Sequence, residues 1–100
     1  MSKIIPMEHP GILLKEEFLD EYGISISQLA KSIGVTRTRV NEIVRGKRNI
    51  TTDTAMRLSL FFGNSVTFWL NLQRHYDLAM VHERFAEFEK TITPYKEVRA

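Results

Sequence analysis

One hundred residues, 43% of them hydrophobic and 26% charged, suffice for one folded domain with a buried core and are too few for a second. The chain has no cysteine, which excludes disulfides and thiolate metal sites, and we expect it to work in the reducing cytoplasm. No apolar run approaches the ~20 residues that span a bilayer. The opening MSKIIPMEHP lacks the apolar segment of a signal peptide, so we expect neither membrane insertion nor secretion.

The net charge of +2 is small, but the basic residues are concentrated in one part of the chain. The first 22 residues hold five acidic residues and two lysines, whereas residues 31–48 hold one acid, Glu42, and six bases. Such a segment is typical of a phosphate-binding surface and equally of a solvated loop, and charge alone does not separate the two. The six bases are Lys31, Arg37, Arg39, Arg45, Lys47 and Arg48.

Glycine and proline divide the chain into helical segments, and no segment keeps the alternating apolar pattern of a strand. Pro10 is suited to the first turn of a helix and predicts a first helix that ends at Gly23. The next helix begins at Ser25, because Ser25 and Gln28 have the spacing of a capping box. This second helix is predicted to end at Gly34.

Two further helices follow in the middle of the chain. The third is predicted to begin at Thr36 and to end at Gly46. The fourth begins at a cap formed by Thr51 or Thr52 and ends at Gly63, which can adopt the left-handed backbone of a helix C-terminus. The residues of the fourth helix that we expect to face inward are Ala55, Leu58 and Phe62.

A fifth helix begins after Ser65, continues toward Lys90 and carries two apolar stripes. The first stripe is expected to be core. The second begins where the core should already be complete, so it packs on a second subunit, on a partner protein or back on its own core. We expect Pro94 to end any helix and residues 95–100 to be a frayed tail. The first stripe is Trp69, Leu72, Tyr76 and Ala79, and the second is Leu78, Val81, Phe85 and Phe88.

Residues 26–46 have the spacing of a helix-turn-helix. Ala30 is small enough for two helices to cross closely, and Gly34 allows the chain to reverse within about three residues. Val40, six residues after Gly34, then packs the second helix of the pair onto the core. A purely structural helical hairpin also has a glycine and apolar spacing, but it rarely has all of these positions, so the pattern favours DNA binding.

The third helix is predicted to present short polar side chains to DNA. Arginine can bind a guanine edge and asparagine an adenine edge in the major groove, and the basic residues that follow can bind phosphates. Glu42 is better interpreted as an ordinary solvated residue, and Gln28 either reaches a phosphate or only caps its helix. The predicted DNA-binding residues are Gln28, Thr36, Arg37, Thr38, Arg39, Asn41, Arg45, Lys47 and Arg48.

The run from residue 9 to about residue 80 resembles the HigA antitoxin family, within the phage-repressor and Cro type of helix-turn-helix. The matching pieces are HPGILLKEEFLDEYGIS, QLAKSIGVTRTRVNEIVRGKRNIT, DTAMRLSLFFG and FWLNLQRHYDL. The helix-turn-helix is shared by a very large superfamily, and the HPG opening and the FWLNLQ–YDL end narrow the resemblance. One mild departure is Ile12, where an acid is common in the family.

The resemblance implies an all-α, five-helix, phage-repressor-like domain with an extended C-terminal helix. We expect one domain over residues 1–100, with a core at about 9–80 and an extension at 81–100. It also implies a homodimer that binds palindromic operator DNA, represses its own operon and neutralises a HigB toxin similar to RelE-type messenger-RNA endonucleases. A dimer is expected physically too, because one helix-turn-helix buries little surface.

Catalysis and cofactors are not expected. His9, His75 and His82 lack the spacing of metal ligands, and no glycine-rich loop could hold a phosphate. His9 is better interpreted as a helix cap. The alternative functions are a stand-alone repressor without a toxin and, third, a protein-interaction module whose basic loop is incidental.

Overall fold

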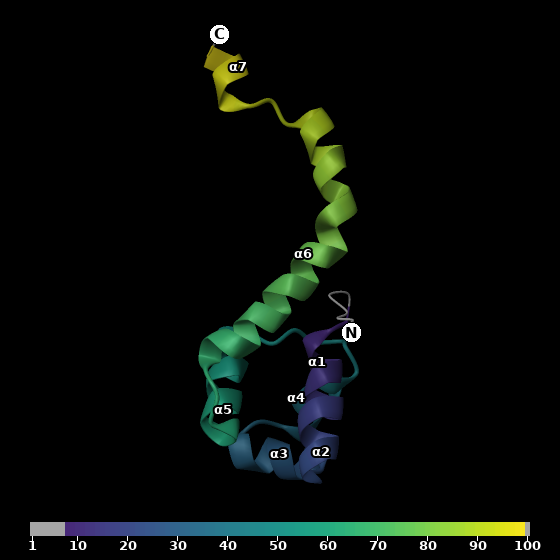
Figure 1. Cartoon of the computed structure of the whole chain (residues 1–100), viewed down its shortest axis with the longest axis vertical. Helices are drawn as coiled ribbons and strands as arrows, with labels where there is room; N and C mark the ends of the chain where they lie inside the picture. The colour runs from purple at the N-terminus through teal and green to yellow at the C-terminus, as the bar shows by residue number, and fades with distance from the viewer. Residues whose placement is uncertain (1–7, 100) are drawn as a thin grey trace.

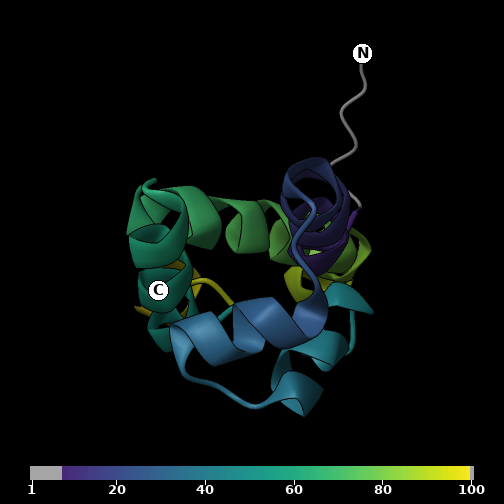
Figure 2. The ribbon, with the colours of Figure 1, turned by 90° about the horizontal axis from the view of Figure 1, so that it is seen from below.

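The computed structural model describes residues 8–99, and every regular element within them is a helix, as predicted. A common core lies among five helices: residues 10–22, α3 (Ile26–Ile33), α4 (Arg37–Val44), α5 (Thr52–Phe62) and α6 (Val66–Thr91). The later part of α6 extends away from this core as a rod (Figure 1). The molecule therefore measures 59 × 29 × 23 Å. Seen from below, α3 lies between α5 and α4, and the first helix and α6 complete the ring (Figure 2). No helix within residues 8–99 is long and apolar enough to cross a membrane.

The first helix begins and ends as predicted, with one local difference. It consists of α1 (Pro10–Leu13), a π-helical segment η1 (Leu14–Leu19) and α2 (Asp20–Tyr22), joined without a break. His9 caps its N-terminus: the Nδ1 atom accepts a hydrogen bond of 2.9 Å from the Gly11 amide. Gly23 ends the helix with φ of 68°. The π-helical segment has the same sequence signals as an α-helix, so the pattern did not reveal it.

The helix-turn-helix is formed by α3 (Ile26–Ile33) and α4 (Arg37–Val44). The capping box before α3 is complete: Ser25 Oγ accepts from the Gln28 amide, and Gln28 Oε1 accepts from the Ser25 amide. Gly34 reverses the chain with φ of 76°, a conformation that costs a residue with a side chain about 1–2 kcal/mol. Thr36 caps α4. The predicted bounds of both helices are confirmed to within two residues.

The C-terminal part contains α5 (Thr52–Phe62), α6 (Val66–Thr91) and α7 (Tyr95–Arg99). The cap of α5 is Thr51, and Ser65 caps α6 as expected. The prediction of a frayed tail was wrong for residues 95–99, and Ala100 lies outside the described residues. Instead of only ending a helix, Pro94 starts one, because its carbonyl accepts from the amides of residues 97 and 98.

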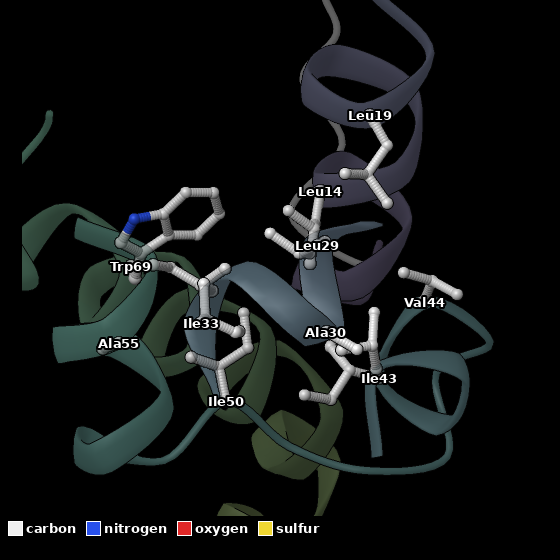
Figure 3. Packing of buried hydrophobic residues seen from close by; sticks show 12 residues of the cluster. Leu14, Leu19, Leu29, Ala30, Ile33, Ile43, Val44, Ile50, Ala55 and Trp69 are labelled. Atoms are coloured by element: carbon white, nitrogen blue, oxygen red, sulfur yellow. The ribbon is translucent and has the colours of Figure 1, made fainter. Parts of the chain in front are cut away.

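The core lies between the five helices (Figure 3). Trp69 of α6 is fully buried and packs against Phe18, with ring centroids 4.9 Å apart. Its indole Nε1 donates to Asn64 Oδ1 at 2.8 Å, so the one polar atom of the ring is satisfied. Side chains from every helix of the ring contribute to the cluster, which is Leu14, Leu19, Leu29, Ala30, Ile33, Val40, Ile43, Val44, Ile50, Ala55, Leu58 and Trp69.

Candidate nucleic-acid interface

Helix α4 is held to the molecule by one buried face. Val40, Ile43 and Val44 are buried on that face. The backbone of the first helix approaches it closely: a Cβ atom on Gly11 would lie 1.7 Å from the carbonyl oxygen of Ile43. Only glycine permits this contact, so the backbone of α1 lies directly against the backbone of α4 at Ile43.

The opposite face of α4 presents Arg37, Thr38 and Asn41, which together line a shallow pocket. Arg37 and Thr38 are exposed, as predicted, and Asn41 is half-buried. Their side chains form no hydrogen bond or ion pair with another described residue. They therefore keep their full hydrogen-bonding capacity for an external ligand.

Arg39 differs from its neighbours on α4. Its Nη2 atom donates to Asp53 Oδ2 at 2.8 Å and to Thr54 Oγ1 at 2.6 Å, both on α5. Thr36, also among the predicted contacts, uses its hydroxyl to accept from the Arg39 amide at 3.0 Å. Both side chains thus have partners within the protein: Thr36 caps the helix that was predicted to begin there, whereas the sequence pattern did not indicate the partners of Arg39.

The basic segment after α4 lies at the surface, and Arg45, Lys47 and Arg48 are all exposed. Arg48 forms an ion pair of 2.8 Å with Glu42, so its charge is partly compensated. Glu42 is a half-buried residue of α4, and its ion pair with Arg48 connects the basic segment to that helix. We had expected Glu42 to be an ordinary solvated residue. Gln28 is exposed at the start of α3 and acts as a cap.

A buried glutamine of α6 binds the chain between the basic segment and α5, and sequence reasoning missed it. Gln73 Oε1 accepts from the amide of Ile50 at 2.7 Å, and Gln73 Nε2 donates to Asp77 Oδ1 at 2.9 Å. Only 6% of Gln73 is exposed. The available signal was a polar residue one turn from Trp69 and next to Leu72, on the apolar face of a long helix.

His9 joins the start of α1 to the same region. Its ring packs edge-on against Tyr76 of α6, with ring centroids 5.0 Å apart. A Cβ atom added to Gly46 would lie 3.7 Å from the Cβ of His9. Burial lowers the pKa of the imidazole below its usual value of 6.5, and nearby Asn49 and Asp77 oppose that shift without reversing it. His9 is a helix cap, as its place before Pro10 predicted. His75 and His82 are exposed.

Within the described residues, no group of three or more histidine and acidic side chains could hold a metal ion. The polar groups that converge on α4 and the following segment are hydrogen-bond donors, acceptors and cations. Such groups suit a polyanion with hydrogen-bonding edges.

Comparisons of this chain with known proteins find relatives with a helix-turn-helix. A family model described as helix-turn-helix matches residues 14–69. Virulence-associated protein I of Dichelobacter nodosus is 48% identical over 79% of this chain and 73% of that protein. Antitoxin HigA-1 of Vibrio cholerae is 37% identical over 84% of this chain and 79% of its own length.

A solved structure of the Pseudomonas aeruginosa antitoxin HigA with the higBA promoter is similar to most of this fold. Its TM-score is 0.82, with 41% identity over 89% of this chain and 98% of that one. The resemblance that the sequence suggested is therefore confirmed. The chain belongs to the helix-turn-helix family that includes the HigA antitoxins.

Proposed function

We propose that this chain is a sequence-specific DNA-binding antitoxin that represses its own operon as a homodimer. The observation that carries the proposal is the outer face of α4, where Arg37, Thr38 and Asn41 have no partner in the described protein. The similar Pseudomonas aeruginosa HigA was solved with promoter DNA, which supports the same ligand here. We place its action in the cytoplasm, where operator DNA lies, and assign it no catalytic role.

In this proposal α4 enters the major groove. Arg37 and Asn41 hydrogen-bond to base edges, because guanidinium matches the acceptors of guanine and carboxamide matches adenine. Arg45, Lys47 and Arg48 contact the sugar-phosphate backbone, which supplies affinity and register but no sequence information.

The homodimer is proposed to form through residues 78–88 of α6. Leu78, Val81, Phe85 and Phe88 recur at alternating spacings of three and four, and all four are exposed on the part of α6 that leaves the core (Figure 1). This spacing is typical of a seam between two helices. A fixed pair of subunits places two recognition helices about 34–36 Å apart, in successive major grooves.

The second activity that we propose is the neutralisation of a HigB-like toxin. This part rests on membership of the family that includes antitoxin HigA-1. Co-purification with the product of the neighbouring gene tests it. Capture of a small basic protein in a stable complex supports the antitoxin role, whereas operator binding without any captured protein supports a stand-alone repressor.

The test of DNA binding is fluorescence anisotropy with the DNA upstream of the gene and with a scrambled duplex of the same length. Arg37→Ala and Asn41→Ala should each weaken operator binding by about 1–3 kcal/mol and change scrambled-DNA binding much less. Arg74→Ala, on an exposed arginine of α6, is the control. Wild-type protein that does not distinguish the two duplexes contradicts the proposal.

A further inference from the structure

One carboxylate oxygen holds two arginines beside the helix-turn-helix. Asp53 lies in the first turn of α5, and its Oδ2 atom accepts from Arg39 Nη2 at 2.8 Å and from Arg57 Nε at 2.9 Å. Arg39 belongs to the first turns of α4, directly after Arg37 and Thr38. Asp53 is therefore in direct contact with the helix that carries the proposed base-reading residues.

The other arginine reaches the first helix of the pair. Arg57 Nη1 donates to the carbonyl oxygens of Ile33 at 2.7 Å and of Gly34 at 3.4 Å. These carbonyls lie at the C-terminal end of α3, in the turn that separates α3 from α4. A continuous chain of contacts thus runs from the end of α3 through Arg57, Asp53 and Arg39 to α4.

These contacts lie at the surface rather than in the core. The Asp53 side chain is 57% exposed and that of Arg39 is 27% exposed. Exposed ion pairs add little to the stability of a fold. Their effect on the orientation of the helices that they connect is different, because a guanidinium group holds an acceptor in a fixed geometry. Arg39 has a second such acceptor in Thr54.

If only its charge mattered, Asp53 would weaken the binding of DNA. It is an acidic residue close to a surface that faces phosphates, so its removal should strengthen binding to any DNA. Removing it should also release Arg39 to contact a phosphate. A loss of operator affinity when Asp53 is removed therefore has the opposite sign to the effect of charge, and it identifies a different role for this residue.

We propose that Asp53 is a positioning residue for operator recognition: it holds Arg39 and Arg57 so that α4 keeps one direction relative to α3. Arg39 then acts inside this bridge and not as a phosphate contact. The proposal rests on the proposed function, because it concerns the orientation of the helix that enters the groove. It also separates Arg39 from the exposed basic residues with which the sequence grouped it.

The test compares operator and scrambled DNA by anisotropy at several salt concentrations. Asp53→Asn keeps the size of the side chain and weakens both charge-assisted bonds, and we expect about tenfold weaker operator binding, while scrambled DNA is bound no more weakly than by the wild type. Asp20→Asn is the matched control, since Asp20 is also exposed and paired, with Lys15 of its own helix. Unfolding of each variant in urea shows whether the fold is intact.

Variants of Arg39 form the second part of the test. If Arg39 binds a phosphate, Arg39→Ala should flatten the slope of log affinity against log salt by about 1, whereas a positioning residue leaves that slope unchanged. Arg39→Ala combined with Asp53→Asn should bind the operator no more weakly than either single variant. If Asp53→Asn does not fold, Arg39→Lys gives the same comparison, because lysine can still bind a phosphate but cannot hold two acceptors in the same geometry.

The two proposals fail in different ways. Wild-type protein that does not bind its upstream DNA overturns the proposed function and this inference with it. If the wild type binds and Asp53→Asn binds equally well or more tightly, only the positioning role of Asp53 is overturned. A reduced salt slope in Arg39→Ala makes Arg39 a phosphate contact and has the same consequence.

Discussion

The first half of α6, taken as residues 66–77, and its second half, residues 78–91, both carry several large apolar residues but have opposite surroundings. In the first half Trp69 is completely buried and Gln73 is 6% exposed, whereas in the second half Leu78 is 59% exposed and Phe85 is 66% exposed. The first half completes the core, and the second half leaves it (Figure 1). One continuous helix therefore serves two purposes, and apolar content alone does not distinguish a core segment from a surface that awaits a partner.

The largest expected effect falls on the first half. Trp69→Ala should lower the free energy of unfolding by about 3–5 kcal/mol, because it removes a fully buried ring and leaves a cavity among its neighbours. Urea denaturation followed by circular dichroism measures this change. A loss below about 1 kcal/mol would mean that the first half does not complete the core.

Substitutions in the second half should leave the unfolding free energy of the monomer almost unchanged. Changing Phe85 and Phe88 together to serine should alter the unfolding free energy of the monomer by at most about 0.5 kcal/mol, since both are exposed. The variant should be a folded monomer by sedimentation equilibrium, with much weaker operator binding. Leu60→Ser is the control, because Leu60 is an exposed apolar residue on α5. A Phe85/Phe88 variant that stays dimeric places the interface elsewhere.

The smallest expected effect concerns His9, which packs against the first half at Tyr76. Because burial holds its pKa below 6.5, the unfolded chain binds a proton more readily than the folded one. Its stabilising effect is complete above pH 6.5 and is lost as pH falls through the folded pKa.

Unfolding free energies measured from pH 7 to pH 5 should therefore decline more in the wild type than in His9→Gln. His75→Gln, the same substitution at an exposed histidine, is the matched control. Equal slopes for the wild type and His9→Gln would remove His9 as a source of the decline.

Local signals in the sequence predicted most of the helix ends. Ser25, Thr36 and Ser65 each cap a helix through a side chain that reaches an amide three residues later, and this interaction depends only on neighbouring residues. The π-helical segment could not be predicted in this way, because it changes the backbone without changing the residue types. The short helix after Pro94 was missed for a similar reason: proline both ends and begins helices.

The candidate site was predicted only in part. The outer face of α4 follows from helical periodicity once Val40 is assigned to the core, so Arg37 and Thr38 could be placed. The partners of Arg39 could not, because Asp53 is 14 residues away and on another helix. The same holds for Gln73 and the amide of Ile50, which are 23 residues apart. Such contacts depend on how helices pack and leave no local pattern.

Hydroxyl-radical footprinting of the upstream DNA tests the central claim most directly, namely that α4 reads DNA while residues 78–88 of α6 pair two subunits. Our account predicts two equal protected patches on one face of the duplex, with centres about 10–10.5 base pairs or a multiple apart. The variant with serine at Phe85 and Phe88 should lose this paired protection at the same protein concentration. A single patch, or uniform protection without a preferred site, would contradict the account.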